Sequence, residues 1–523
     1  SFSFSPVSIK DIEAILKRMK KSGSSGFDGI SSIHVKSVIK EIAPALTEIT
    51  NSSFDEGVFP ACFKLAKVIC VFKNKGKKSE MNNYRPVSNL PVIGKCIEIA
   101  ADIQLRKYCE KYNLFGSHQH GFRRSRSTHT ALLTAVTRWR TKKIEKRYQG
   151  VLMFDLSAAY DLLDKDLFIR KAEILGISGR ALNWLESYLT DRSQVVQVNG
   201  AQSTSRKLKF GTPQGSSCSC LIFALYVGDI EMWTDESFIQ AFADDTFISV
   251  EADSQDLLKE KLEREGKRVL DYFAANLMVT NPSKTGLLVF RPILKRQQDS
   301  SLQITLAGEQ INEVDNAKLL GMWISSDLKW NTQIEKLSSD VNYGVSLLRR
   351  LRGHLGEREL KMISDGLVLS KIRYCCSVYG VEGLRLDEQD PRSSLLTAVQ
   401  KLQNTCLRII TGTKKSDHVS ISSMLHSTKF LSVNQMIAYT TMLEMWKAKT
   451  FEVPVLGTLL DRARNDNRNL RSDSQHIVKY SENEPFAITA ASLWNRASHR
   501  FKTTNLLVVA KNEAKTLVKS LPL

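Results

Sequence analysis

The stretch QAFADDTFIS, Gln240 to Ser249, sets two aspartates side by side within a run of apolar residues. The apolar residues on either side predict two strands joined by a tight turn at Asp244 and Asp245. Two adjacent carboxylates repel each other and lose hydration in such a setting, so they need a compensating positive charge. A divalent cation is the commonest source of that charge. The turn therefore predicts a metal site at the end of a strand.

A third carboxylate, Asp155, follows another apolar strand in VLMFDLSAAYDLLD, residues 151–164, and lies 89 residues before Asp244. Because strand ends of one sheet can meet in space, the three aspartates can together hold two Mg²⁺ about 3.5–4 Å apart, and Mn²⁺ can substitute. The backbone carbonyl of Leu156 is a further candidate ligand. Such a pair of ions lowers the pKa of a nucleic-acid 3′-hydroxyl and neutralises a triphosphate. A purely structural role in capping the turn is the alternative.

Two further stretches are suited to binding a nucleotide. GTPQGSS, residues 211–217, carries two glycines and a proline that fix a turn, and the backbone of such a turn can come close to a bound nucleotide. Gln214 is its polar contact. Upstream, Lys73 or Lys75 and Arg85 flank the tip of a predicted hairpin and can grip a triphosphate, since an arginine makes bidentate contacts with phosphate.

The charge of the chain also indicates a polyanionic partner. The 523 residues carry a net charge of +19. Residues 1–150 contain 27 Lys and Arg but only 12 Asp and Glu, a net charge of +15, which leaves +4 for the other 373 residues. The N-terminal part is therefore the predicted surface for a polyanion, with solvated helix faces as the alternative.

Three arginines, Arg123, Arg124 and Arg126, lie close together in the loop that precedes a predicted helix. They suit phosphate contacts that follow a template backbone, and a solvated loop is the alternative. The nine cysteines form no CxxC pair and predict free, mostly buried thiols of an intracellular protein. No apolar run approaches the roughly 18 residues that span a bilayer, so we expect no membrane association. The chain starts at Ser1 without a methionine, and we expect it to be part of a longer protein.

Periodicity and turn residues predict mixed secondary structure along the chain. We expect the seven tryptophans to anchor cores, and His118, His120 and His129 to be hydrogen-bonded loop residues. The Arg/Asn/Ser-rich stretch at 462–475 is predicted to be a linker or a clamp-like extension. The predicted helices lie at 8–20, 33–56, 256–278 and in a run over 332–412, with others within 121–147 and 207–230. The predicted strands lie within 64–76, where the strand breaks into a basic loop, and at 284–290 and 302–324.

Taken in chain order, these motifs resemble those of a known family. NYRPVSNLPVIGKCIE, GFRRSRSTHTAL, FDLSAAYD, GTPQGSS, FADD, NPSKTGLLVF and KLLGMWIS are similar to the successive motifs of reverse transcriptases of non-LTR, LINE-type retrotransposons. LQNTCLRIITGT and ASLWNRA resemble the C-terminal part of the jockey and CR1/L2 branches. The resemblance covers nearly the whole chain.

The resemblance implies an α+β fold of the right-hand polymerase type. Its parts are fingers, a palm made of an antiparallel sheet with helices, and a helical thumb, followed by a C-terminal extension that is structural or binds nucleic acid. The implied bounds are residues 1–62 for the N-terminal extension, 63–150 for the fingers and 151–325 for the palm with fingers insertions. The thumb spans 326–412 and the C-terminal extension 413–523.

The resemblance also implies catalytic roles for four residues. Asp155, Asp244 and Asp245 stand where the family has its metal ligands, with the carbonyl of Leu156 beside them. Lys284 stands where family members place a lysine proposed as the general acid for the leaving pyrophosphate; an exposed structural lysine is the alternative.

Nucleotide binding is implied for four more residues. Gln214 would contact the incoming dNTP, and Arg85 with Lys73 would contact its phosphates. Tyr160 stands at the position of the aromatic residue that excludes a ribose 2′-hydroxyl. One departure from the family is Phe242, where a tyrosine commonly precedes the acidic turn; only a hydroxyl is lost there, so we expect activity to survive.

The activity that follows is RNA-directed DNA synthesis from a 3′-hydroxyl primer, with target-primed reverse transcription as the family's process. The expected partners are the element's RNA template, target or primer DNA, and dNTP, and the expected location is the nucleus after a cytoplasmic ribonucleoprotein stage. Alternatives are a domesticated, non-catalytic RNA-binding protein, a group II intron-type reverse transcriptase and maturase, and an RNA-dependent RNA polymerase. The intact aspartates argue against the non-catalytic binding protein. The thumb-like and C-terminal segments argue against the group II intron-type enzyme, and TPQG with Tyr160 argues against the RNA polymerase.

Overall fold

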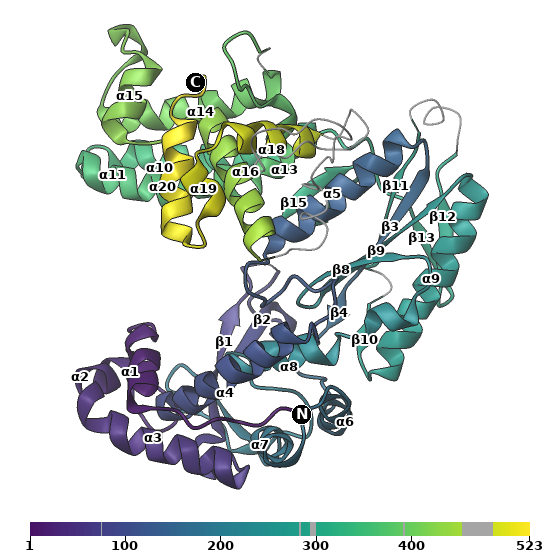
Figure 1. Cartoon of the computed structure of the whole chain (residues 1–523), viewed down its shortest axis with the longest axis vertical. Coiled ribbons are helices and arrows are strands. Elements are labelled where there is room, and N and C mark those ends of the chain that lie inside the picture. The colour runs from purple at the N-terminus through teal and green to yellow at the C-terminus, as the bar shows by residue number, and fades with distance from the viewer. Residues whose placement is uncertain (75, 282–283, 293–299, 391–392, 452–484) are drawn as a thin grey trace. The chain divides into compact units, whose positions relative to one another are not determined.

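The computed structural model describes residues 1–74, 76–281, 284–292, 300–390, 393–451 and 485–523. Helices and strands are mixed up to Ser325, and the described residues after it form helices without strands (Figure 1), which confirms the predicted α+β class. Two compact units divide the chain. Unit 1 comprises Ser1–Phe122, Phe154–Thr246 and Arg264–Lys284, and unit 2 comprises Arg123–Met153, Phe247–Glu263 and Thr285–Leu523.

The sheet of unit 1 is built on the predicted hairpin. β1 (Leu65–Phe72) pairs antiparallel with β2 (Tyr84–Asn89) and parallel with β5 (Ser193–Val198). The short strands β6 (Ala201–Gln202) and β7 (Arg206–Lys207) both pair with β5. In the β1–β2 register Arg85 lies opposite Val71, so the hairpin presents Arg85 close to its tip.

Seven α-helices lie entirely within the described residues of unit 1, and part of a further helix at residues 255–275 belongs to it as well. Helix α1 begins with a capping box in which Ser8 and Asp11 bond each other's backbone nitrogens. The single helix predicted at 33–56 is wrong, because Val38 leaves helical geometry with φ −130° and ψ 35° and divides it into α2 and α3. The helices are α1 (Ile9–Arg18), α2 (Ser32–Ser37), α3 (Ile39–Glu56), α4 (Val92–Lys111), α6 (Lys165–Ile174), α7 (Gly179–Leu189) and α8 (Ser217–Tyr226).

Trp184 of α7 anchors the core of unit 1. Its ring stacks on Tyr188 at 5.5 Å and meets Phe54 and Phe59 edge-on at 5.9 and 5.6 Å. Below these rings, Arg192 and Glu98 form a buried ion pair at 3.8 Å, with only 1% of each side chain exposed. Burial raises the pKa of Glu98, while the charge of Arg192 acts in the opposite direction.

The predicted strands around the acidic turn are present. β8 (Phe238–Phe242) ends just before the turn and β9 (Asp245–Ala252) begins within it. Further along lie α9 (Gln255–Ala275) and the short strand β10 (Val279–Thr280), which pairs with β4 (Leu156–Ser157). Thus two pieces of unit 1 that are far apart in sequence are bonded together directly after Asp155.

The sheet of unit 2 packs against a long helix. β3 (Tyr148–Phe154) lies between β11 (Gly286–Phe290) and β9. Trp139 of α5 (Thr128–Ile144) is fully buried and lies 5.8 Å from the ring of Phe247 and 5.1 Å from that of Phe290. Two hairpins follow, β12 (Gln303–Leu306) with β13 (Glu309–Asn312) and β14 (Asn316–Leu319) with β15 (Met322–Ser325).

The rest of unit 2 is helical, which confirms the predicted run over 332–412 and extends it. A π-helical turn at Asp365–Leu369 separates α11 from α12. The stretch at 462–475 lies outside the described residues. The helices are α10 (Asn331–Leu351), α11 (Glu357–Ser364), α12 (Ser370–Arg373), α13 (Cys376–Tyr379), α14 (Ser394–Thr411), α15 (Ile421–Thr428), α16 (Val433–Thr450), α18 (Pro485–Arg496), α19 (His499–Thr503) and α20 (Leu507–Val518).

Most tryptophans and cysteines lie as expected. The core prediction is wrong for Trp233, which is 41% exposed although its ring contacts that of Tyr272 edge-on at 5.6 Å. Trp323 is half-buried and the other five tryptophans are buried. All nine cysteines are free, and six of them are buried. None of the helices in the described residues has the length and hydropathy of a bilayer-spanning segment.

Candidate active site

The acidic turn is held by a buried glutamine that our reading of the sequence overlooked. Ala243 adopts a left-handed backbone with φ +59°, a conformation that a non-glycine residue adopts at a cost of roughly 1–2 kcal/mol. The side-chain oxygen of Gln119 accepts hydrogen bonds from the backbone nitrogens of Ala243 and Gly121, at 3.1 and 2.7 Å. Gln119 is fully buried, so this amide fixes the turn from inside. Its signal in the sequence is a glutamine two residues before a glycine, in QHG.

The structure brings the three predicted aspartates into electrostatic contact. Burial raises the pKa of Asp244, and the negative charge of Asp155 raises it further. Burial, Asp244 and Asp155, in that order, raise the pKa of Asp245. Asp155 therefore makes Asp244 and Asp245 harder to ionise, and a cation placed beside these carboxylates would relieve the repulsion.

This set has the donor chemistry of a site for a hard divalent cation, since carboxylate oxygens are its preferred ligands. Within the described ranges, no three His, Cys, Asp or Glu side chains already stand in a metal-binding cluster. The aspartates thus fit a metal by chemistry and mutual repulsion, although their side chains are not gathered around one point. Leu156, the predicted carbonyl ligand, lies in β4 opposite Thr280 of β10.

Lys284 lies against this acidic set. Its Nζ is 2.9 Å from Oδ2 of Asp155, which lies 129 residues away in sequence. The backbone explains the approach: Asn281 N–H donates to the carbonyl of Asp155 at 3.0 Å, and Lys284 N–H donates to the carbonyl of Asn281 at 3.0 Å. Both side chains are substantially exposed, 62% for Lys284 and 45% for Asp155, so the ion pair adds little stability. Its value is that it places an ammonium group beside a candidate metal ligand.

Arg85 also reaches the acidic set, whereas Lys73 makes a local contact. The positive charge of Arg85 lowers the pKa of Asp244 and opposes the effects of burial and of Asp155. Lys73 is exposed at the hairpin tip, where its Nζ donates to the carbonyl of Asn82 at 2.8 Å. The alternative residue, Lys75, lies outside the described residues.

Tyr160 and the GTPQG turn form a connected surface beside the aspartates. The ring of Tyr160 stacks on Phe223 of α8 with 4.6 Å between centroids, which restricts its rotation. The Tyr160 carbonyl accepts a hydrogen bond from Thr212 N–H at 2.9 Å. Gln214 Nε2 donates to both carboxylate oxygens of Asp161. The predicted aromatic and amide residues are thus brought together, with Asp161 as a partner that the sequence did not reveal.

The three arginines belong to unit 2 and differ in exposure. Only 9% of Arg123 is exposed, Arg126 is half-buried, and Arg124 is exposed. The guanidinium carbon of Arg124 lies 5.1 Å from the ring centroid of Phe451, a cation–π distance. Arg124 is therefore the arginine of this loop best placed to meet a polyanion.

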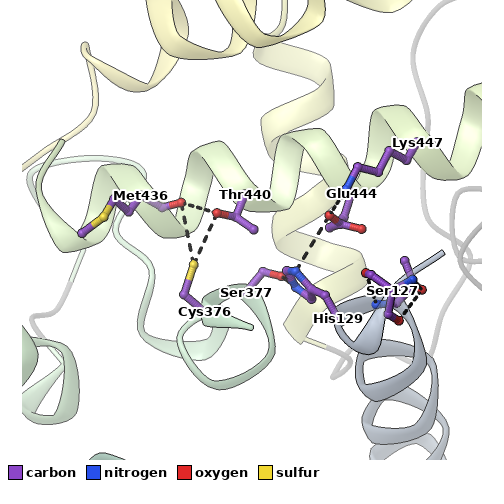
Figure 2. Close-up of polar contacts among 9 residues, drawn as sticks. Ser127, His129, Cys376, Ser377, Met436, Thr440, Glu444 and Lys447 are labelled. Atoms are coloured by element: carbon purple, nitrogen blue, oxygen red, sulfur yellow. Dashed lines mark hydrogen bonds and ion pairs between the residues drawn. The ribbon is translucent and has the colours of Figure 1, made fainter. Parts of the chain in front are cut away.

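The arginine loop leads into a helix whose first turn is anchored by buried polar groups, as Figure 2 shows. His129 is not a loop residue as predicted, because α5 begins with a capping box at Ser127 and includes it. His129 Nε2 shares a hydrogen bond with Ser377 Oγ, and its Nδ1 lies 3.8 Å from Oε1 of Glu444. Glu444 also pairs with Lys447 at 2.7 Å. Burial lowers the pKa of His129, so the ring is neutral at pH 7.

Comparisons with known proteins agree with these motifs. Residues 73–324 match the family model described as reverse transcriptase (RNA-dependent DNA polymerase). The probable RNA-directed DNA polymerase from transposon BS of Drosophila melanogaster is 22% identical over 418 residues, which are 79% of this chain and 45% of that protein. The RNA-directed DNA polymerase from mobile element jockey of Drosophila funebris is 22% identical over 422 residues, 78% of this chain and 44% of that protein.

Among solved structures, telomerase from Candida albicans in complex with a fragment of telomeric RNA is similar at 13% identity with a TM-score of 0.37. The similarity covers 71% of this chain and 66% of that one. The chain spans less than half the length of the two polymerases that it matches.

Proposed function

We propose that this chain is the RNA-directed DNA polymerase of a non-LTR retrotransposon and extends a 3′-hydroxyl primer, a proposal supported by the match of residues 73–324 to the reverse transcriptase family model. The observation that carries the proposal is that Asp155 lies close enough to Asp244 and Asp245, from a distant stretch of the chain, to raise the pKa of both. Polymerases of this kind use such carboxylates to bind divalent cations. The similarity to polymerases of the jockey and BS elements supports the retrotransposon origin.

Asp155, Asp244 and Asp245 would hold two Mg²⁺, with the carbonyl of Leu156 as a further ligand. When bound, such ions supply a lowered pKa for the primer 3′-hydroxyl and neutralise the charge of the triphosphate. Lys284 carries a proton on Nζ beside Asp155 and would donate it to the departing pyrophosphate. Arg85, close enough to change the pKa of Asp244, would bind the phosphates of the nucleotide, with Lys73 as an outer contact.

Selection of the nucleotide would depend on Tyr160 and Gln214. Phe223 restricts the ring of Tyr160, so it cannot easily move aside for a ribose 2′-hydroxyl. Gln214 lies in the turn that is bonded to the Tyr160 backbone, which places both side chains on one rigid frame. This pair would favour dNTP over NTP.

The proposed partners are an RNA template and primer or target DNA. The net charge of +15 on residues 1–150 suits nucleic acid, because phosphate neutralisation releases counterions. Synthesis primed on target DNA implies action in the nucleus, after a ribonucleoprotein stage in the cytoplasm. Imaging of the tagged full-length element protein in dividing cells tests the location, and exclusion from the nucleus would contradict it.

Primer extension on an RNA template tests the activity. Purified protein is given Mg²⁺ and either dNTPs or NTPs, with Asp245→Asn as the control. We expect extension with dNTPs that the substitution abolishes and that EDTA stops until Mg²⁺ is restored. Extension with NTPs alone would instead identify an RNA polymerase. Tight RNA binding without extension, under conditions where a known reverse transcriptase is active, would indicate a non-catalytic binding protein.

A further inference from the structure

Asp161 has no role in the proposed chemistry, yet its carboxylate is held by a residue of the nucleotide site. It lies six residues after Asp155, on the far side of the short strand β4, and is not one of the assigned metal ligands. Both of its oxygens accept from Gln214 Nε2, at 2.9 and 2.8 Å. Hydrogen bonds to a charged acceptor are stronger than those between neutral groups, so this contact can hold a side chain in one orientation.

The contact decides which end of the Gln214 amide faces away from Asp161. A glutamine amide ends in a donor nitrogen and an acceptor oxygen, and the two are easily exchanged by a half rotation. An ionised carboxylate can only accept hydrogen bonds, so it selects the orientation with Nε2 toward it. The other end of the amide, Oε1, is then left as the acceptor that Gln214 offers to a ligand.

The backbones of the two residues are also fixed with respect to each other. Gly211 N–H donates to the carbonyl of Leu163 at 2.8 Å and Thr212 N–H donates to that of Tyr160 at 2.9 Å. A Cβ atom on Gly211 would lie 2.7 Å from the carbonyl oxygen of Asp161, so only glycine permits this approach. On the other side, the Gln214 carbonyl accepts from Ser88 N–H of β2 at 2.7 Å. With the backbones fixed, the freedom left to Gln214 is the rotation of its side-chain bonds, which the contact with Asp161 restricts.

We propose that Asp161 is a positioning residue for the nucleotide site, which orients the amide of Gln214 so that its oxygen faces the incoming nucleotide. This inference rests on the proposed function, because it takes Gln214 as a contact of the nucleotide. It goes beyond that function because it assigns Asp161, which lies outside the metal site, an effect on the affinity for dNTP.

Steady-state primer extension with a varied concentration of one dNTP measures the effect. We expect Asp161→Ala to raise the KM for dNTP about fivefold to tenfold, the effect of losing one charge-assisted hydrogen bond. The kcat should change less than about twofold, since the carboxylate does not touch the reacting atoms. Asp161→Asn keeps one acceptor oxygen and should give an intermediate KM. Asp166→Asn, an exposed aspartate in the first turn of α6, is the matched control and should leave KM unchanged.

A double-mutant cycle separates positioning from a direct role. If Asp161 acts through Gln214, the variant with both residues changed to alanine should have no higher KM than Gln214→Ala alone. Independent, multiplying effects of the two substitutions would overturn the proposal. So would an unchanged KM in Asp161→Ala, while a loss of thermal stability with no change in KM would show that the carboxylate only supports the fold.

Nucleotide binding without catalysis keeps this test distinct from that of the proposed function. The dissociation constant of the next complementary dNTP is measured on protein bound to primer and RNA template with Ca²⁺ in place of Mg²⁺. Primer extension by wild type, together with equal dNTP affinity of wild type and Asp161→Ala, would overturn the inference alone. Selective dNTP binding that depends on Asp161, without extension in Mg²⁺, would overturn the polymerase function alone, and the absence of any dNTP binding would overturn both.

Discussion

Asp244 and Asp245 are the residues on which the proposed chemistry depends most directly. We predict that Asp244→Ala or Asp245→Asn reduces primer extension below detection, because each removes a negatively charged ligand from the predicted metal site. RNA affinity should stay nearly unchanged, since the carboxylates repel rather than bind a phosphate backbone. Extension assays and filter binding on the same preparations measure the two effects. Substantial residual extension by either variant would refute the two-metal assignment.

Tyr160 provides a second test at the scale of single residues. Its ring stacks on Phe223, which restricts its movement, so a 2′-hydroxyl on the proposed nucleotide would clash with the Tyr160 ring. A clash of about 1–3 kcal/mol corresponds to roughly fivefold to 150-fold discrimination. We expect Tyr160→Ala to raise ribonucleotide incorporation by that factor, measured as the ratio of kcat/KM for NTP and dNTP. Tyr160→Phe keeps the ring and should keep the discrimination.

The arginine loop before α5 acts as an element, and its members should not contribute equally. Arg124 is exposed and Arg126 half-buried, whereas Arg123 is nearly buried. We predict that Arg124→Gln flattens the slope of log affinity for single-stranded RNA against log salt by about 0.7, the value of one phosphate contact. Arg123→Gln should lower thermal stability instead. Equal slopes for wild type and Arg124→Gln would contradict a role of this loop in template binding.

The first turn of α5 should make the stability of unit 2 depend on pH. Burial lowers the pKa of His129, and Lys447 acts in the same direction while Glu444 opposes it. Because the folded state binds the proton less readily than the unfolded state, this site contributes full stability above about pH 6.5 and loses it as the pH falls below that value. The melting temperature of wild type should therefore fall between pH 7 and pH 5.5.

Two histidine variants isolate this effect. His129→Gln keeps a hydrogen-bonding group near Ser377 but cannot titrate, so its melting temperature should fall less over the same interval. His354→Gln, a change at an exposed histidine, should behave as wild type. A pH dependence that is the same in all three proteins would show that other groups cause it.

At the scale of the whole molecule, the buried pair of Arg192 and Glu98 is the most demanding polar contact of unit 1. Both side chains are 1% exposed, so removal of one leaves a buried charge without its partner. We predict that Arg192→Ala destabilises the protein by about 3–5 kcal/mol. Arg180→Ala, at an exposed arginine of α7, should stay within about 0.5 kcal/mol of wild type. Urea unfolding measures both, and equal midpoints would contradict the prediction.

The sequence determined much of the local structure because local signals encode it. Runs of apolar residues mark β1 and β9, the serine and aspartate at positions 8 and 11 cap α1, and glycines mark the turn at residues 211–215. The order of the motifs was enough to indicate a reverse transcriptase. It also identified Asp155, Asp244 and Asp245 as one group, since each follows or begins a strand.

Only the tertiary structure revealed the residues that act through others. Gln119 holds the acidic turn across 124 residues of sequence, and Asp161 orients Gln214 across 53. His129 appeared as part of a loop until its contacts with Ser377 and Glu444 placed it inside a buried network. Such contacts join side chains over long separations, and their geometry depends on how the elements pack. Periodicity and spacing report which residues form an element, but not which distant residue that element will meet.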